Sequence, residues 1–404
     1  MVNFLIIYTH AWEQRKLSSL VDFANGINAP KEQYGKGRKM ISVMDILSAS
    51  PIEYHNIKNA VAVDKNTEQN YRVECGDLVF VRSSEVVNEV GWAKAYSDDD
   101  YALFSGFTIR GKKKEMFDSY FVELVLNYKN RMQIESKAGG STRFNVSQMI
   151  LSNLSFKQPS VPEQTTVGNF FRTLDDTITL HKRKLDTMKK LKRGYLQQMF
   201  PQAGESVPQV RFAGFTELWQ ERSLGEVAEI VGGGTPDTAN PAYWNGNIEW
   251  FSPTEIGTET YVSISQKKIT ELGLKNSSAK MLTGGRTILF TSRAGIGDMA
   301  ILTRPAATNQ GFQSLEIRKT FDVYFIYSMG SKIKEYALKN ASGSTFLEIS
   351  GKNLGRMKLS IPAFEEQIVI GNFFHNLDDQ ITAQQQRLMQ LKQLKLAYLQ
   401  KMFL

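Results

Sequence analysis

Arginine, lysine, asparagine and glutamine side chains that suit contacts with nucleic acid lie in several short segments of the sequence. Arg and Lys pair best with guanine in the DNA major groove, Asn and Gln pair best with adenine, and phosphate contacts need only well-placed positive charge. The candidates are Lys36, Arg38, Lys39, Arg82, Arg110, Lys112, Lys113 and Arg143 in the first half of the chain, and Arg286, Arg293, Asn309, Gln310 and Lys352 in the second half. Each residue alone is more commonly a solvated charge or a turn amide, so only the groups favour nucleic-acid contact.

Two Leu-Asp-Asp segments place adjacent carboxylates at Asp175 and Asp176 and at Asp378 and Asp379. Paired carboxylates can bind a metal ion or serve as acid and base. Both pairs, however, lie in segments with helical periodicity, and adjacent residues on a helix point in different directions. The pattern therefore favours capping, helix pairing or docking of a partner subunit, and its recurrence suits two copies of one partner.

Motifs for catalysis and cofactor binding are incomplete in this sequence. Asn240-Pro-Ala-Tyr resembles the Asn-Pro-Pro-Tyr motif of adenine methyltransferases, but Ala242 replaces the second proline and no glycine-rich cofactor loop precedes it. Ser350-Gly-Lys-Asn lacks the first glycine and the final Ser or Thr of a phosphate-binding loop. The four histidines have no metal-ligand spacing. We therefore predict a protein that is not an enzyme and that holds no metal or cofactor of its own.

The composition is that of a basic globular protein without disulfides. Lys and Arg number 49 against 41 Asp and Glu, and the resulting net charge of +8 suits an acidic partner such as nucleic acid. Cys75 is the only cysteine, which excludes an intramolecular disulfide and favours the cytoplasm. The apolar runs are too short for a membrane span or a secretory signal. A chain of 404 residues should form two or more domains.

A long internal repeat organises the chain. The segment from Glu163 to Phe200 recurs from Glu366 to Phe403 at a constant offset of 203 residues, and 20 of 38 positions are identical. Apolar residues in both copies follow one another at helical spacing. They include Phe171, Leu174, Ile178 and Leu185 in the first copy, and Phe374, Leu377, Ile381 and Leu388 in the second. We predict two helices of roughly 38 residues, or about 57 Å each at 1.5 Å per residue.

The two predicted helices should pair with each other. Each has a narrow apolar stripe that it cannot bury alone, and the near-identical stripe of the other copy is available in the same chain. We therefore predict an antiparallel pair. A polar residue interrupts the stripe in both copies, at His181 and Gln384. It is either a solvated position or a polar layer that sets the register of the pair.

The repeat continues outside the helices. The segment from Trp12 corresponds to the segment from Trp219, and Gly139-Gly-Ser-Thr corresponds to Ser342-Gly-Ser-Thr, at slightly different offsets. The drift in offset indicates loop insertions within a shared framework. We predict an α+β protein with mixed α/β domains at residues 1–158 and 219–361, long helices at 159–200 and 362–404, and a linker at 201–218.

Several motifs occur once in each half of the chain. They are a Trp-x-x-x-x-Leu start, a Gly-Asp or Gly-Arg strand, Gly-Ser-Thr, Pro followed by Glu-Gln, Leu-Asp-Asp, and a helix ending in Tyr-Leu-Gln-x-Met-Phe. In combination they resemble the DNA-specificity subunit of Type I restriction-modification systems, over nearly the whole chain. The sequence departs from this pattern at its start, because FLIIYTHAW from Phe4 stands before the first Trp where RFAGFTELW from Arg211 stands before the second, and we expect the start of the first domain to be shortened.

The resemblance implies that each domain is a target-recognition domain for one half of a split, asymmetric double-stranded DNA site, and that the paired helices set the spacing and dock partners. It implies two modification subunits, two restriction subunits in the full complex and no membrane. S-adenosylmethionine, ATP and Mg²⁺ are then expected on those partners and not on this chain. The alternative is a stand-alone DNA-binding coiled-coil scaffold. A simple repressor would more naturally obtain two-fold symmetry by dimerising, so the internal duplication favours the first interpretation.

Overall fold

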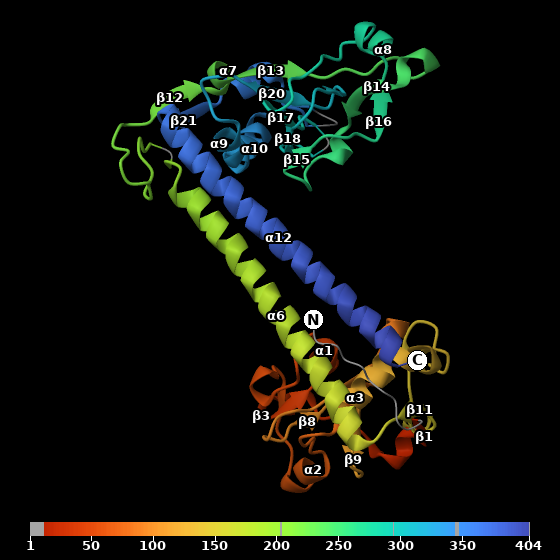
Figure 1. Ribbon diagram of the computed structural model, residues 1–404. Coiled ribbons are helices and arrows are strands. Elements are labelled where there is room, and N and C mark those ends of the chain that lie inside the picture. Colours follow the sequence, from red (N-terminus) through yellow and green to blue (C-terminus); the bar gives the residue numbers. More distant parts are fainter. Residues whose placement is uncertain (1–11, 203, 294, 344–346, 404) are drawn as a thin grey trace. The chain divides into compact units, whose positions relative to one another are not determined.

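The structure is a computed structural model that describes residues 12–202, 204–293, 295–343 and 347–403. The segment from Phe4 that was predicted to be short, and Ser344 and Thr345 of the second Gly-Ser-Thr motif, lie outside the described residues. The chain divides into two compact units, residues 1–181 with 387–404, and residues 182–386. Each unit combines sheets, short helices and parts of two long helices (Figure 1), which confirms the predicted α+β class.

The first unit contains short strands and helices that precede a long helix. The strands are β1 Glu13–Lys16, β2 Val21–Asn25, β3 Tyr34–Ile41, β4 Ala60–Val61, β5 Leu78–Val81, β6 Ser83–Ser84, β7 Ala93–Ala95, β8 Leu103–Phe104, β9 Thr108–Lys113, β10 Phe144–Asn145 and β11 Ser155–Gln158. The helices are α1 Val43–Leu47, α2 Lys65–Asn70, α3 Ser119–Leu124, α4 Arg131–Glu135, α5 Gln148–Ser152 and the long helix α6 Val161–Gln198, which continues into the second unit. Strands pair in the orders β2-β9-β5-β7, β4-β3-β8, β1-β11 and β10-β6.

The second unit repeats this arrangement. Its strands are β12 Gln220–Ser223, β13 Ala228–Gly232, β14 Trp244–Phe251, β15 Tyr261–Val262, β16 Lys267–Ile269, β17 Thr287–Phe290, β18 Met299–Leu302, β19 Ala307–Thr308, β20 Gln313–Ile317 and β21 Lys358–Ile361. Its helices are α7 Leu224–Val227, α8 Glu271–Lys275, α9 Val323–Ser328, α10 Gly330–Asn340, α11 Gly351–Gly355 and the long helix α12 Phe364–Met402, which continues into the first unit. Strands pair in the orders β13-β20-β17-β18-β15, β16-β14-β19 and β12-β21.

The central strands of the two main sheets explain why both halves fold alike. All four residues of β5, with sequence LVFV, are buried, and so are all four residues of β17, with sequence TILF. A continuous apolar run of this length is typical of a strand covered on both faces. In each unit this strand pairs with the same two antiparallel neighbours, β9 and β7 in the first and β20 and β18 in the second.

The long helices pair antiparallel within each unit. In the first unit the start of α6 packs on the end of α12, where the rings of Phe170 and Tyr398 lie 5.1 Å apart. In the second unit the start of α12 packs on the end of α6, where Phe373 and Tyr195 lie 5.1 Å apart. Phe373 is the equivalent of Phe170 and Tyr195 is the equivalent of Tyr398, so the second contact repeats the first with the two helices interchanged. This is expected of an internal pseudo-two-fold repeat. The predicted pairing is therefore confirmed.

Most residues of the predicted apolar stripe are buried. Phe171, Leu174, Leu185, Phe374, Ile381 and Leu388 are at most 8% exposed, whereas Ile178 and Leu377 are half-buried. Gln384 is also only 8% exposed and His181 is half-buried. The polar-layer interpretation therefore describes Gln384 better than a solvated position does. Among the described residues, neither these helices nor any other is long and apolar enough to cross a membrane.

Four aromatic residues attach each domain to the two long helices. In the second unit Trp219 and Phe325 pack against Phe200, at the end of α6, and Phe200 stacks on Phe374 of α12 with ring centres 5.9 Å apart. In the first unit the corresponding residues are Trp12, Phe121, Phe403 and Phe171. The Trp and the final Phe of the repeated motifs therefore meet in one core.

The predicted linker at residues 201–218 is packed and is not a free connection. Arg211 forms an ion pair with Glu366 of α12, with an N–O distance of 2.7 Å, and the ring of Phe212 lies 5.7 Å from that of Phe373. The backbone N–H of Val210 donates to the carbonyl of Gln198 at 3.0 Å. Sequence composition predicted a linker here, but it could not reveal that Val210, Arg211 and Phe212 contact the long helices.

Candidate nucleic-acid interface

The first aspartate of each Leu-Asp-Asp segment joins one domain to both long helices. Asp175 on α6 accepts a hydrogen bond from the Tyr120 hydroxyl and pairs with Lys395 of α12 at 2.6 Å. Asp378 on α12 accepts from the Tyr324 hydroxyl at 2.8 Å and pairs with Lys192 of α6 at 2.7 Å. The two clusters are equivalent members of the repeat. They support helix pairing as the role of these two carboxylates.

The tyrosines in these clusters are fixed as proton donors. Burial, followed by the charge of Asp175, raises the pKa of the Tyr120 hydroxyl far above its ordinary value. Burial and the charge of Asp378 do the same to the pKa of Tyr324. Each hydroxyl therefore stays protonated and can donate to its aspartate at any physiological pH.

The second aspartate of each segment points elsewhere. Asp176 is exposed, and the Asp379 side chain is 65% exposed with His375 3.6 Å away. Asp175→Asn should therefore lower the free energy of unfolding by about 2 kcal/mol, because it leaves the partly buried Lys395 without its charge partner. Asp176→Asn should change it by less than about 0.5 kcal/mol. Urea unfolding of both full-length variants measures the difference, and equal effects would contradict this division of roles.

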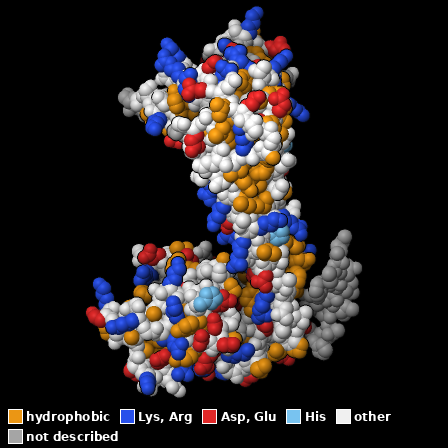
Figure 2. All heavy atoms as spheres, turned by 90° about the vertical axis from the view of Figure 1, so that its left-hand side faces the viewer, with side chains coloured by type: hydrophobic (Ala, Val, Ile, Leu, Met, Phe, Trp, Pro, Cys, Tyr) orange, Lys and Arg blue, Asp and Glu red, His pale blue; other side chains and the backbone are white. Residues whose placement is uncertain are grey.

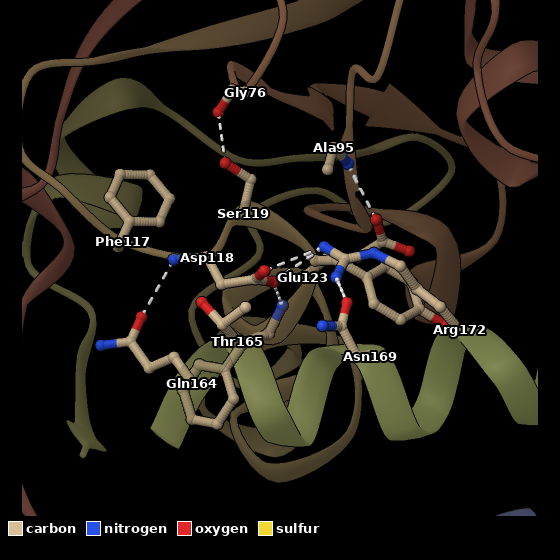
Figure 3. A network of polar contacts seen from close by, with 12 residues as sticks. Gly76, Ala95, Phe117, Asp118, Ser119, Glu123, Gln164, Thr165, Asn169 and Arg172 are labelled. Carbon is tan, nitrogen blue, oxygen red and sulfur yellow. Dashed lines mark hydrogen bonds and ion pairs between the residues drawn. The ribbon is translucent and has the colours of Figure 1, made fainter. Parts of the chain in front are cut away.

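The Glu-Gln motif at the start of each long helix fixes the neighbouring domain, and Figure 3 shows the copy on α6. The Gln164 Oε1 atom accepts from the backbone N–H of Asp118 at 3.1 Å, and its Nε2 atom donates to the carbonyl of Pro159. Gln367 makes the same two contacts, with Asp322 and Pro362. The repeated glutamine is therefore explained by backbone contacts and needs no ligand.

An acidic side chain on α3 is more weakly ionised than usual. Glu123 accepts from the backbone N–H of Ala95 at 2.8 Å (Figure 3). Burial is the largest cause that raises its pKa to about 7, although Lys94 and Lys395 oppose the shift. The folded protein therefore holds a proton on Glu123 at mildly acidic pH.

This shift predicts a pH-dependent stability. Because the pKa of Glu123 in the folded protein lies above the ordinary value of 4.5, protonation of Glu123 stabilises the folded protein. This contribution is complete below pH 4.5 and is lost as pH rises through 7. Glu123→Gln mimics the protonated form, so its stability relative to the wild type should rise by about 2 kcal/mol between pH 5 and pH 8. Urea unfolding at several pH values tests this, with Glu115→Gln as a solvent-exposed control. A constant difference between variant and wild type would contradict the assignment.

The basic segment from Lys36 lies on a bulged part of β3. Gly35 and Gly37 both have positive φ, and the exposed Lys36 lies between them. Arg38 instead packs 3.9 Å from the ring centre of Tyr101, and Lys39 donates to a backbone carbonyl at 2.7 Å. Of this segment, Lys36 has the exposure that a phosphate contact needs.

The basic segment on β9 is largely engaged within the protein. Arg110 is 8% exposed and donates to the backbone carbonyls of Asn70 and Arg72. Lys113 donates to the carbonyl of Phe117 at 2.7 Å, and Lys112 pairs with a glutamate at 3.2 Å. Arg110 and Lys113 therefore have hydrogen-bond partners within the protein, and the carbonyls that accept from Arg110 belong to residues far away in the sequence.

Arg82 and Arg143 lie together around one loop of the first domain. The Arg82 Nη1 atom donates to the carbonyl of Gly106 at 3.3 Å, and the Arg143 guanidinium lies 5.7 Å from the ring centre of Phe107. Phe107 is 54% exposed. Sequence analysis missed Phe107 because it stands in the apolar run FSGFTI, which is typical of a core strand; its place after Ser-Gly was the only signal of a turn.

The candidate residues of the second domain also include one that is bonded within the protein and others that lie on loops. Arg286 donates to the carbonyl of Ile317 at 2.7 Å, so it is also engaged internally. Arg293, Asn309 and Gln310 lie on two loops joined by a backbone hydrogen bond of 2.8 Å from Ser292 to Gly311. Gln310 and Lys352 are exposed.

Basic side chains do not form one continuous surface on the face drawn in Figure 2. They are interspersed with acidic side chains over the globular part of each unit. Charge alone therefore does not locate a nucleic-acid interface on this face, and the grouping of loops is the better guide. In the first unit Arg82 and Arg143 lie around one loop, and Lys36 is an exposed cation on β3; in the second unit the candidates are Arg293, Asn309, Gln310 and Lys352.

Comparison with known proteins finds matches along nearly the entire chain. The family described as Type I restriction modification DNA specificity domain matches residues 10–190 and again residues 216–393. The MjaIX specificity subunit of a Type I restriction enzyme from Methanocaldococcus jannaschii is 36% identical over 167 residues, which cover 40% of this chain and 38% of that protein. A putative MjaX specificity subunit from the same organism is 22% identical, over 95% of this chain and 91% of that protein.

A solved structure shares the fold. The S subunit of a Type I restriction-modification system from M. genitalium superimposes with a TM-score of 0.62 at 17% sequence identity, over 99% of this chain and 98% of that one. At this identity the likeness concerns the fold, which includes both domains and both long helices.

Proposed function

Because the chain belongs to the family of Type I restriction-modification DNA specificity domains and carries two of them, it is a specificity subunit, and we propose that each domain recognises one half of a bipartite, asymmetric site in double-stranded DNA. The duplicated framework carries this proposal. Both domains have an equivalent central strand with equivalent neighbours and an equivalent attachment to the long helices, yet their loops present different side chains. Two similar domains with different loops suit two different half-sites.

The proposed role of the chain is recognition without catalysis. Two modification subunits would dock on the repeated features of the paired helices, where Asp176 and Asp379 are exposed at equivalent positions. Two restriction subunits would complete the full complex. S-adenosylmethionine, ATP and Mg²⁺ would then be held by these partners. The single, exposed cysteine suits a reducing cytoplasm as the compartment.

The test is co-expression with the modification subunits followed by single-molecule sequencing of methylated DNA. A bipartite motif with an unspecified spacer is expected. Failure to form a complex, together with the absence of a split motif, would contradict the proposal. That outcome would favour the alternative of a stand-alone DNA-binding scaffold. Membership of the specificity-domain family argues against this alternative.

The same assay tests whether the long helices set the spacing. Inserting about four residues after Ile178 adds roughly one turn to α6, or about 6 Å. The expected result is a longer unspecified spacer with both half-sites unchanged, because the insertion lies outside the domains. An altered half-site would refute the role of the helices as spacers.

A further inference from the structure

A cavity of 610 Å³ opens beside Arg82 in the first domain. Its polar lining comes from Arg82, Asn25 at the end of β2, Lys137, Asn145 on β10, Ser147 and Gln148 at the start of α5. The lining thus offers two cations and three amides, and within the described part of the chain no Asp or Glu contributes to it. This chemistry suits the acceptor-rich edges of DNA bases and the phosphates beside them.

Phe107 projects from a loop that Arg82 holds in place. The backbone N–H of Arg82 donates to the carbonyl of Phe107 at 2.9 Å, and its guanidinium donates to the carbonyl of Gly106. A Cβ atom on Gly106 would lie 1.8 Å from the Oδ1 atom of Asn28, so a larger residue here would require the Asn28 side chain to move. The loop therefore keeps an apolar ring exposed next to the Arg143 guanidinium, and Arg82, which bonds to this loop, also lines the cavity. An apolar side chain in such a place suits contact with a thymine methyl group or a base step.

The second domain has matching backbone hydrogen bonds at this place. The N–H of Val146 donates to the carbonyl of Arg82 at 3.0 Å, and the N–H of Ile349 donates to the carbonyl of Ser292 at 3.1 Å. These matched bonds make Ser292 the counterpart of Arg82.

Three further positions correspond by the same criterion. The two backbone hydrogen bonds between Gly139 and Asn145 recur between Ser342 and Glu348. Ser147 and Ser350 cap equivalent helices, so Gln148 corresponds to Gly351. The bond from Arg82 to Phe107 recurs from Ser292 to Gly311 at 2.8 Å, so Phe107 corresponds to Gly311.

The side chains at these positions differ completely between the domains. Arg82, Phe107, Asn145 and Gln148 in the first domain correspond to Ser292, Gly311, Glu348 and Gly351 in the second. Since both sets sit on one backbone framework, the framework does not require the first set for folding. Side chains that change on a constant backbone, and that line an open cationic cavity, are those expected to carry sequence selectivity.

We propose that the cavity lined by Arg82, together with Phe107 on the loop that Arg82 holds, contacts the base pairs of the half-site recognised by the first domain. Arg82 has donors that fit the O6 and N7 atoms of guanine, and the Gln148 amide fits the N6 and N7 atoms of adenine. Phe107 supplies the apolar contact. This inference rests on the proposed function and names the residues that determine specificity within it.

The test uses substitutions that the same backbone already carries in the second domain. They are Arg82→Ser, Phe107→Gly and Gln148→Gly, and each is examined in the complex with the modification subunits. Single-molecule methylation sequencing should show a relaxed preference of roughly 5- to 150-fold at one or two positions of one half-site, the same half-site for all three variants. The other half-site and the spacer should not change. Gln69→Ala, on the exposed face of α2, is the control and should keep the wild-type motif.

Three results would overturn the inference. The variants could retain the wild-type preference at every position, they could alter both half-sites, or they could fail to bind the modification subunits in size-exclusion chromatography although circular dichroism shows them folded. The last result would place the cavity at a subunit contact. If the wild-type complex itself methylates no bipartite site, the proposed function fails; if it does and the variants match it, only this inference fails.

Discussion

Replacing Phe374 by alanine should lower the local stability of the second unit by about 3 to 5 kcal/mol. Phe374 is fully buried and stacks on Phe200, which in turn packs against Phe325 and Trp219. The truncation leaves a cavity where three segments of the chain meet, and none of these aromatic rings can refill it without leaving its own contacts. Hydrogen exchange followed by mass spectrometry should show the loss in peptides from β12 and β21.

Phe364 provides the matched control on the same helix. It is 40% exposed at the start of α12, so Phe364→Ala should cost less than about 1 kcal/mol. In the Phe374→Ala variant, peptides from β5 and β9 of the first unit should keep their wild-type protection. Equal losses in both variants would show that the aromatic cluster does not stabilise the attachment of the domain to the helices.

The long helices could be predicted from sequence because their signal is local. Helical periodicity fixes which residues share a face, and the stripe through Phe171, Leu174 and Leu185 is buried as that periodicity predicts. The duplication then identified the packing partner of each helix, since two near-identical apolar stripes can bury each other. Little long-range information was needed for this part of the fold.

The role of each charged side chain could not be predicted in the same way. Arg110 and Arg286 have the composition and context of surface residues, but each donates to backbone carbonyls that only the folded sheet brings near. Asp175 and Asp176 are neighbours in sequence, yet one joins a tyrosine to a lysine and the other is exposed. Sequence gives the residue type, whereas the acceptor or partner depends on distant segments.

The exposure of Phe107 could not be predicted from sequence either. An apolar residue in an apolar segment is normally assigned to the core, and its neighbours Phe104 and Ile109 are indeed fully buried. The turn at Gly106 and Phe107 separates β8 from β9 and leaves Phe107 exposed. In the second domain the equivalent position is Gly311, so the shared framework does not need an aromatic ring here. This difference between the two domains is the reason why we assign Phe107 to DNA recognition.

The glutamate of the Glu-Gln motif has different partners in the two units, and this difference predicts a large loss of stability when the partner in the second unit is removed. Glu366 on α12 is 1% exposed and receives two bonds of 2.7 Å from Arg211, whereas the half-buried Glu163 on α6 receives one bond of 3.2 Å from Trp12. Arg211→Ala should therefore destabilise the second unit by about 3 to 5 kcal/mol, because an unpaired carboxylate stays buried. Hydrogen exchange of the peptide spanning the start of α12 measures this loss.

The reason for the loss can be separated from simple loss of packing by a second substitution. Glu366→Gln in the Arg211→Ala background removes the buried charge, and it should recover at least about half of the lost stability, since a neutral amide is far cheaper to bury than an unpaired carboxylate. Glu163→Gln is the matched change in the first unit and should cost less than about 1 kcal/mol. If the double variant is no more stable than Arg211→Ala, the loss comes from the packing of the loop at residues 201–218 and not from the charge of Glu366.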